Sequence, residues 1–266
     1  MKLIKSTALG ALCLASAAMV PAVSQAALIG VTFNNELISI DETTGAGSLI
    51  GNLDSDMAAF GLSDRNGELY TYDQYASLVR QLDPTSGATL NSIDVGIATG
   101  GEGAIAFRSD GVGFMSRSSG PTGEIWSIDV TSGTSMSIGS LSVSMDGMDF
   151  NSADVLYGIS QYSAALYTID QGSGAVSLIG DTGLDSSTVL SGLTFGMDDM
   201  LYAIINDSLY SIDATTGSAS LIGATGFSSV SGLTYMADAS SVPEPTSLAL
   251  LGLGLVGLNF MRRKSA

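Results

Sequence analysis

A nine-residue pattern recurs five times, and its spacing constrains the fold more than any other feature of the sequence. The pattern is an apolar residue, a bulky residue, any residue, Ile or Leu, Asp, three residues and Gly. Its copies are LISIDETTG (37–45), VRQLDPTSG (79–87), IWSIDVTSG (125–133), LYTIDQGSG (166–174) and LYSIDATTG (209–217). Their aspartates, Asp41, Asp83, Asp129, Asp170 and Asp213, lie 42, 46, 41 and 43 residues apart. The middle of the chain is therefore expected to be five copies of one structural unit.

Each unit divides into four short strands. In residues 189–223 the strands are SGLTF (191–195), LYAII (201–205), SLYSID (208–213) and SASLIG (218–223). Apolar residues occupy both alternating sets of positions, as in strands that are buried on both faces. Units of this length with four strands are typical of β-propeller blades.

The number of strands predicts how the ring closes. Residues 28–51 supply only three strands, four full sets of four follow, and a single strand SGLTY (231–235) ends the array. The total is twenty strands, or five blades. We therefore predict an all-β fold, a five-bladed β-propeller over residues 27–240, in which SGLTY completes the first blade and leaves no gap in the ring.

Most of the repeated residues have a structural explanation. In the Asp-x-x-Ser/Thr-Gly segment, the aspartate can accept turn N–H groups and the glycine can take a positive φ. Calcium binding is the functional alternative, although the segment lacks a dense set of oxygen ligands.

Other repeated positions also have structural explanations. Gly147, Gly192 and Gly232 lie on innermost strands, where backbones converge. The recurrent tyrosines are expected in the core: Tyr70, Tyr157, Tyr167, Tyr202 and Tyr210. Arg80 stands where other copies have Ile, Trp or Tyr, which indicates either a functional position or a solvated blade edge.

The charge distribution excludes one class of partner. The chain has 26 acidic and 9 basic residues and no histidine. Residues 27–242 contain four arginines, no lysine and 25 acidic residues, a net charge of −21. Such a field repels nucleic acid, so we expect no nucleic-acid binding.

Few residues are available for catalysis. Without histidine, and with its one cysteine in the N-terminal segment, the body has no common nucleophile–base pair and no His/Cys zinc site. Paired carboxylates remain, and some five-bladed propellers are glycosidases. The best candidates are Asp146 and Asp149 on one innermost strand, with Asp64 or Glu102 as partner. Two carboxyls about 5–10 Å apart would be required. We expect the protein not to be an enzyme, with a glycosidase-like hydrolase as the alternative.

The N-terminus has the features of a secretory signal peptide, residues 1–26. Lys2 and Lys5 precede the apolar run ALGALCLASAAMV (8–20), and SQA (24–26) predicts cleavage between Ala26 and Ala27. The single cysteine, Cys13, lies inside this segment, so the mature chain is expected to have no disulfide.

The C-terminus, SVPEPTSLALLGLGLVGLNFMRRKSA (241–266), contains a Pro-Glu-Pro motif, an apolar run and a basic cluster. In this order and position they resemble the PEP-CTERM sorting signal of exported proteins in Gram-negative bacteria. The resemblance implies recognition by an exosortase, a membrane transpeptidase, and removal of the tail. The recognition motif would be Val242, Pro243, Glu244 and Pro245, and the basic stop Arg262, Arg263 and Lys264.

The apolar run of this tail is short for a membrane span. LALLGLGLVGLNFM (248–261) has 14 residues, whereas a spanning helix needs about 20. The basic cluster would remain in the cytoplasm and place the body outside. A short transmembrane helix that inserts transiently before processing is the expected structure; a permanent C-terminal anchor is the alternative.

The Asp-x-x-Thr-Gly turn also resembles the repeats of quinoprotein dehydrogenases. Their tryptophan-rich docking motifs are missing, since Trp126 is the only tryptophan. We therefore expect no cofactor, with calcium as the one alternative. The sequence predicts a membrane-tethered precursor that becomes a non-catalytic binding protein at the cell surface or in the extracellular matrix. Its expected partners are the secretion machinery, the exosortase and, because PEP-CTERM systems accompany exopolysaccharide production, exopolysaccharide or another matrix component.

Overall fold

The structure is a computed structural model that describes residues 27–97, 101–118, 120–160, 162–184 and 190–236. In these segments all regular structure is β-strand, in five four-stranded antiparallel sheets. Blade 1 contains β20 (Val230–Met236), β1 (Ala27–Thr32), β2 (Glu36–Ile40) and β3 (Gly47–Asn52). Blade 2 contains β4 (Ala59–Arg65), β5 (Glu68–Asp73), β6 (Leu78–Leu82) and β7 (Thr89–Ile93).

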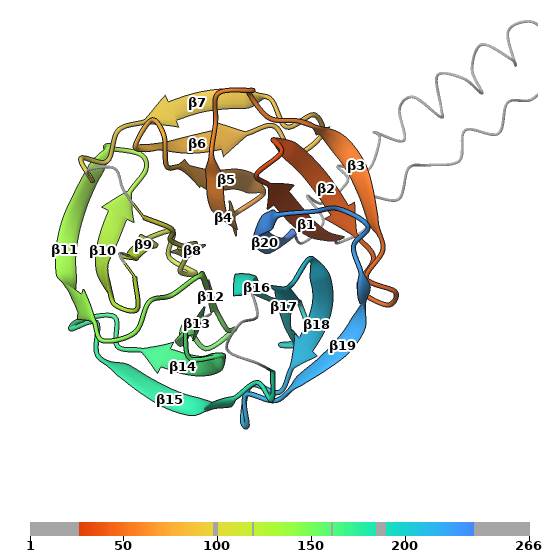
Figure 1. Ribbon diagram of the computed structural model, residues 1–266. Coiled ribbons are helices and arrows are strands. Elements are labelled where there is room, and N and C mark those ends of the chain that lie inside the picture. The colour runs from red at the N-terminus through yellow and green to blue at the C-terminus, as the bar shows by residue number, and fades with distance from the viewer. Residues whose placement is uncertain (1–26, 98–100, 119, 161, 185–189, 237–266) are drawn as a thin grey trace, which may run out of the picture. The chain divides into compact units, whose positions relative to one another are not determined.

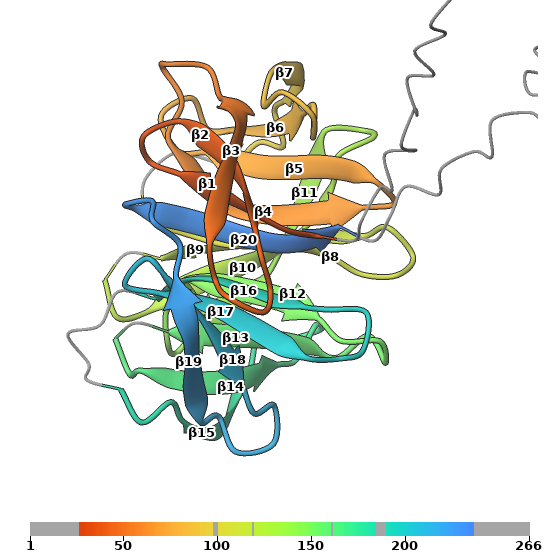
Figure 2. The ribbon, with the colours of Figure 1, turned by 90° about the vertical axis from the view of Figure 1, so that its right-hand side faces the viewer.

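The other three blades have the same order from the centre outwards. Blade 3 contains β8 (Ile105–Phe107), β9 (Gly113–Ser118), β10 (Gly123–Asp129) and β11 (Thr134–Leu141). Blade 4 contains β12 (Gly147–Phe150), β13 (Leu156–Ser160), β14 (Ala165–Ile169) and β15 (Val176–Asp181). Blade 5 contains β16 (Leu190–Phe195), β17 (Leu201–Ile205), β18 (Ser208–Ile212) and β19 (Ala219–Ala224). Figure 1 looks along the ring axis, and Figure 2 shows the blades from the side. The predicted five-bladed β-propeller is confirmed.

The last strand closes the ring as the strand count predicts. β20 pairs antiparallel with β1, so Leu28 lies opposite Tyr235 and Val31 opposite Gly232. The hydroxyl of Ser231 also donates to the Ala59 carbonyl of blade 2, at 2.7 Å. One blade is thus made from both ends of the body, and this pairing holds the two ends together.

The hydrophobic core consists of five clusters, each shared by two neighbouring blades. The cluster between blades 1 and 2, for example, contains Val31, Leu37, Leu62 and Leu69, all nearly inaccessible to solvent. Because each sheet packs on a neighbour at both faces, apolar residues are needed in both alternating sets of positions. This packing accounts for the absence of simple alternation in the sequence.

Glycine is required where the innermost strands converge. A Cβ on Gly147 would lie 2.6 Å from the Leu193 nitrogen, and one on Gly232 would lie 2.6 Å from the Gly61 carbonyl carbon. Side chains at these positions would force the inner strands apart. The expectation for the inner-strand glycines is confirmed.

The repeated Asp turns connect the third and fourth strands of each blade at the rim. In blade 1, Asp41 Oδ1 accepts hydrogen bonds from the Thr43 and Thr44 amides, both at 2.9 Å, and Gly45 has a φ of 75°. The turn of one blade also packs on the outermost strand of the preceding blade. A Cβ on Gly51 of β3 would overlap the Ser86 carbonyl oxygen of the next turn. The Asp-x-x-Ser/Thr-Gly segment is therefore both a hairpin turn and a contact between blades.

Candidate functional site

The ring has two ends, which the strand directions define. All innermost strands run the same way, because β4, β8, β12 and β16 each begin a set of alternating strands and β20 takes the equivalent place beside β1. The end where the innermost strands finish also carries the Asp turns, and we call it the turn face. The opposite end is called the loop face. Asp64 and Asp149 lie near the turn face, whereas Asp146 and Glu102 precede their inner strands and lie toward the loop face.

A belt of hydrogen bonds between blades surrounds the axis near the turn face. It is made by the residue at one equivalent position of each inner strand: Thr234, Ser63, Ala106, Asp149 and Thr194. Four of the five side chains accept the main-chain N–H of the next inner strand: Thr234 from Asp64, Ser63 from Phe107, Asp149 from Phe195 and Thr194 from Tyr235, at 2.8–3.2 Å. Ala106 has no such oxygen. The belt therefore departs from five-fold regularity at blades 3 and 4.

Asp149 takes the place of a hydroxyl in this belt. Its Oδ2 accepts from the Phe195 amide and the Thr194 hydroxyl, both at 2.8 Å, and its Oδ1 accepts from the Phe150 amide at 2.8 Å. Burial raises the pKa of Asp149 to about 6 against the lowering effect of these bonds, and the charge of Asp64 raises it further. Both oxygens of Asp149, one of the two best catalytic candidates, thus accept hydrogen bonds from groups of the fold itself.

Asp64 is the second axial carboxyl. It lies at the end of β4, is half-buried, and accepts the Gly67 amide at 3.0 Å. Burial raises its pKa to about 6, with a smaller contribution from the charge of Glu68. Asp64 and Asp149, from blades 2 and 4, are therefore two carboxyls near the axis with raised pKa values, and the charge of Asp64 acts on Asp149.

The other two candidates are not part of this pair. Asp146 is buried just before β12, and its main-chain N–H donates to the Ile159 carbonyl at 2.9 Å. It is three residues from Asp149, or about 10 Å along a strand. Glu102 precedes β8, where its carbonyl accepts the Ser118 amide at 2.6 Å. Sequence analysis named Asp64 only as a partner, because inner-strand alignment around the axis is not visible in the sequence.

Arg80 has a structural role on the loop-face side of blade 2. Its Nε and NH2 donate to Asp73 Oδ2 at 3.1 and 2.8 Å, and the Asp73 side chain is fully buried. The other oxygen of Asp73 accepts main-chain N–H groups of Ala58 and Tyr75. The break in the repeat is therefore a buried ion pair that sequence analysis missed. An Asp at the end of a strand followed by Arg across the hairpin was the available signal.

Among the hollows on the described surface, three are formed by residues whose positions are known in full. One of about 290 Å³ lies at the ends of β8, β12 and β16, among Phe107, Phe150 and Phe195. A second, of about 520 Å³, lies over the turn face of blade 3 beside Arg65. The third, of about 460 Å³, lies on the loop face beside Arg117 and Glu124. All three lack the enclosure of a substrate cavity and are suited to surface contacts.

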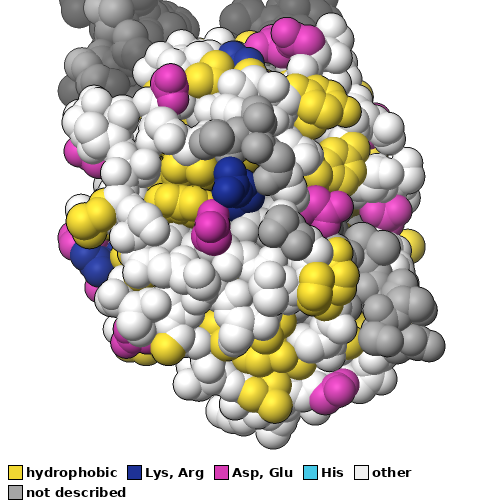
Figure 3. Space-filling model, turned by 60° about the vertical axis from the view of Figure 1, so that its left-hand side comes forward, with side chains coloured by type: hydrophobic (Ala, Val, Ile, Leu, Met, Phe, Trp, Pro, Cys, Tyr) yellow, Lys and Arg dark blue, Asp and Glu magenta, His cyan; other side chains and the backbone are white. Residues whose placement is uncertain are grey.

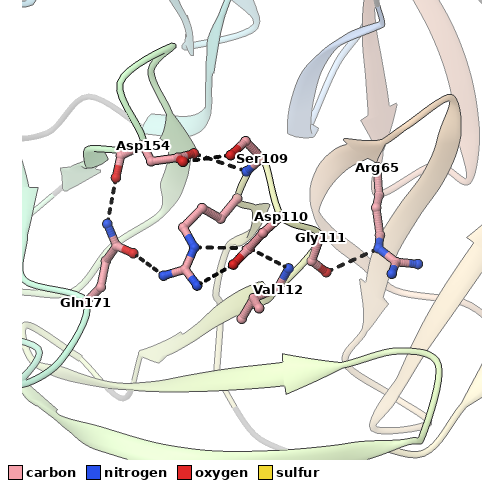
Figure 4. Close-up of polar contacts among 8 residues, drawn as sticks. Arg65, Ser109, Asp110, Gly111, Val112, Asp154 and Gln171 are labelled. Carbon is pink, nitrogen blue, oxygen red and sulfur yellow. Dashed lines mark hydrogen bonds and ion pairs between the residues drawn. The ribbon is translucent and has the colours of Figure 1, made fainter.

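Polar contacts join blades 3 and 4 on the turn face (Figure 4). The amide and hydroxyl of Ser109 donate to the two oxygens of Asp154 at 3.1 and 2.6 Å. Arg108 donates to both oxygens of Asp110 and to Gln171 of the next blade. The bonds from Ser109 to Asp154 and from Arg108 to Gln171 join blades 3 and 4 and orient these side chains on the turn face.

On the face that Figure 3 shows, apolar side chains form several groups with polar side chains between them. Each outermost strand exposes one large apolar residue: Leu49, Leu90, Met136, Leu178 and Leu221. Single exposed apolar residues are common on protein surfaces and do not define a site.

In the described segments, no group of three or more acidic, cysteine or histidine side chains is placed to hold a metal ion. The same segments contain no helix with the length and apolar character of a membrane span. The predicted signal peptide with its cleavage at Ala26 and Ala27, the recognition motif at 242–245 and the basic stop at 262–264 lie outside the residues whose structure is described, apart from the main chain of Ala27.

Sequence comparison identifies two families. Residues 241–264 match the PEP-CTERM protein-sorting motif. Residues 90–244 match a family described as a repeat of unknown function (DUF6923). The second match covers more than half of the chain, which therefore belongs to this repeat family. The sorting motif indicates an exported protein with a membrane-anchored precursor that an exosortase processes. No curated protein matches the sequence.

Solved structures share the fold at low sequence identity. A chain in the crystal structure of a nidogen/laminin complex is 10% identical, with a TM-score of 0.56, and the match covers 80% of this chain and 99% of that chain. A candidate gluconolactonase is 12% identical, with a TM-score of 0.54 and coverage of 81% and 82%. Virginiamycin B lyase from Staphylococcus aureus, solved in an inactive form with quinupristin, is 12% identical, with a TM-score of 0.46 and coverage of 74% and 69%. The first two likenesses support the fold alone.

Proposed function

We propose that this exported propeller is a non-catalytic binding protein of the cell surface or extracellular matrix, and that exopolysaccharide is its partner. Export and sorting by an exosortase follow from the motif at 241–264. Binding to a polysaccharide goes beyond that motif. Its support is the association of such sorting systems with exopolysaccharide, together with a rigid, acidic ring that carries shallow polar hollows.

The proposal that the protein is not an enzyme rests on the hydrogen bonds that Asp149 accepts. Hydrolysis of a glycoside requires one carboxyl to give a proton and another to act on the sugar or on water. Both oxygens of Asp149 are instead bonded to groups of β12 and β16 at 2.8 Å. The remaining acids of the repeat, from Asp41 to Asp213, lie in exposed rim turns away from the axis. Such an arrangement suits a scaffold better than a catalytic centre.

A retention experiment tests this proposal. The full chain, purified in mild detergent, is run through native gels that contain one polysaccharide each, and the same mixtures are assayed for released reducing ends. Retardation by at least one polysaccharide without sugar release is the expected result. Retardation by none of a broad panel would contradict the proposal.

A glycosidase-like hydrolase that uses the axial carboxyls is the second candidate. The observation that favours it is the pair Asp64 and Asp149, whose pKa values are both raised to about 6. Carboxyls of this kind can serve as general acids near neutral pH. Sugar release by the full chain that disappears in both D64N and D149N would establish this candidate. A matched control is D213N, which changes an exposed rim aspartate.

A further inference from the structure

The hollow over blade 3 combines residues from three separate segments of the chain. The turn after β8 supplies Asp110, the hairpin of β10 and β11 supplies Ser127, Thr131, Ser135 and Met136, and Arg65 forms the wall from blade 2. Its volume of about 520 Å³ lies within the range of small-molecule sites. The axial carboxyls Asp64 and Asp149 are not among its lining residues.

Its charged groups are oriented by hydrogen bonds within the protein. Arg65 Nε donates to the Gly111 carbonyl at 3.2 Å, which fixes the guanidinium at the wall (Figure 4). Arg108 holds both oxygens of Asp110, at 3.1 and 2.8 Å. Asp129 Oδ1 accepts the Thr131 amide at 2.8 Å. A ligand that meets groups already fixed loses less free energy in ordering them.

The balance of charge restricts the ligand. Hydrogen bonds from Arg108 lower the pKa of Asp110, and bonds from Ser132 and Thr131 lower that of Asp129, so both are ionised at neutral pH. Arg65 also lies 3.7 Å from Glu68, which offsets its charge. Arg108 in turn offsets the charge of Asp110. Asp129 therefore leaves the hollow with one net negative charge, beside an excess of hydrogen-bond acceptors. It favours a ligand that brings O–H donors and repels one that brings carboxylate or sulfate groups.

The uncharged lining fits the same kind of ligand. Ser127, Thr131 and Ser135 present hydroxyls that both donate and accept. Met136 is 68% exposed at the edge of the hollow and offers a flexible apolar surface. A pyranose ring has hydroxyls around its edge and an apolar C–H face, so it can use both kinds of contact.

We infer that this hollow is a subsite for a neutral, hydroxyl-rich saccharide unit. The inference rests on the proposed function and adds to it the place of contact and the class of polymer: neutral glycans bind, while uronate-containing or sulfated glycans do not. The contact is made by blade 3 and by Arg65, not by the axis of the ring.

The test uses the full chain in mild detergent and three variants. S135Y places a large side chain into the hollow. S220Y makes the same change on β19, the outermost strand of blade 5, where Ser220 is exposed and lines none of the three hollows described above. Thermal unfolding shows whether each variant is folded, and S135A provides a second, milder change in the hollow. Affinity is measured by titration with a neutral polysaccharide such as dextran or a galactan, and with an anionic one such as alginate.

We expect the full chain to bind a neutral polymer in preference to alginate, with S135Y weakening that binding by about tenfold or more and S220Y by less than about twofold. S135A is expected to weaken it by a few-fold. Equal binding by S135Y, S220Y and the parent chain would overturn the subsite while leaving the proposed binding function intact. Preference for alginate would overturn the neutral class. Absence of binding to every polymer would overturn both proposals.

Discussion

The aspartates of the rim and those of the axis differ in the direction of their pKa shifts. The rim aspartates lie in exposed turns, where hydrogen bonds from hydroxyls and amides lower their pKa; that of Asp41 falls to about 2. Asp64 and Asp149 lie near the axis, where burial raises the pKa of each to about 6. Hydrogen bonds at the rim thus favour the ionised form of aspartate, whereas burial near the axis favours its protonated form.

The two regions also differ in how faithfully they repeat. The same aspartate forms the same turn in all five blades, because every blade needs one hairpin and one contact with its neighbour. The belt position near the axis carries Thr, Ser, Ala, Asp and Thr in blades 1 to 5. Residues that repeat in every blade are therefore those that form the blade itself. Residues that vary near the axis give single blades different side-chain chemistry. Arg80 shows that variation alone does not mark function.

The largest expected effect comes from breaking the Arg80–Asp73 pair. In R80L the fully buried Asp73 carboxylate loses its cationic partner, so the free energy of unfolding should fall by about 3 kcal/mol or more. Urea denaturation measures this. R117L is the control, because Arg117 pairs with the half-exposed Glu124 and should cost less than about 1 kcal/mol. Similar costs for both variants would show that Arg80 lies at a solvated edge.

A somewhat smaller effect is expected where the outermost strand of one blade contacts the Asp turn of the next blade. In G51A the new Cβ would overlap the Ser86 carbonyl oxygen of the next blade, so the backbone must shift. Overpacking of this kind costs about 1–3 kcal/mol. G172A is the control, since its nearest neighbour outside the adjacent residues would be 3.6 Å away. If G51A unfolds at the same urea concentration as G172A, close packing of Gly51 on the turn of the next blade does not contribute to stability.

The dependence of stability on pH separates the two regions. The rim aspartates have lowered pKa values, so the stability they contribute is present above pH 3.8 and is lost as the pH falls further. Asp64 and Asp149 have raised pKa values, so their contribution is fully present below pH 3.8 and is lost as the pH rises toward 6. We therefore expect maximum stability near pH 4.

Denaturation at fixed ionic strength between pH 3 and 7 measures this profile. From pH 4 to 6 the free energy of unfolding should fall by on the order of 2 kcal/mol, after a discount for solvent screening at the half-buried Asp64. The double variant D64N/D149N should remove this decline and keep the loss below pH 4. A profile of the parent chain that rises steadily from pH 4 to 6 would contradict the assignment.

The sequence predicts the ring better than it predicts the site, for a physical reason. The five blades and the closure by SGLTY follow from local strand patterns and a count, and each Asp turn depends on residues within five positions of one another. The pair Asp64 and Asp149 and the hollow beside Arg65 depend instead on how different blades are aligned around the axis. A small rotation of one blade would change those neighbours without changing the pattern of any strand.

The smallest expected effect concerns a single bond of the belt. In T234V the isosteric side chain keeps its packing, but the Asp64 amide loses the acceptor that lies 3.0 Å away in the parent chain. Leaving one partly buried amide unsatisfied should cost about 1 kcal/mol. T134V is the control, because it removes only the exposed contact between the Ser132 and Thr134 hydroxyls, and it should change stability by less than about 0.5 kcal/mol. Because the lost bond joins blade 1 to the strand that carries Asp64, T234V should also alter the pH profile between 4 and 6, whereas T134V should not. An unchanged profile would mean that the axial carboxyls titrate independently of the belt.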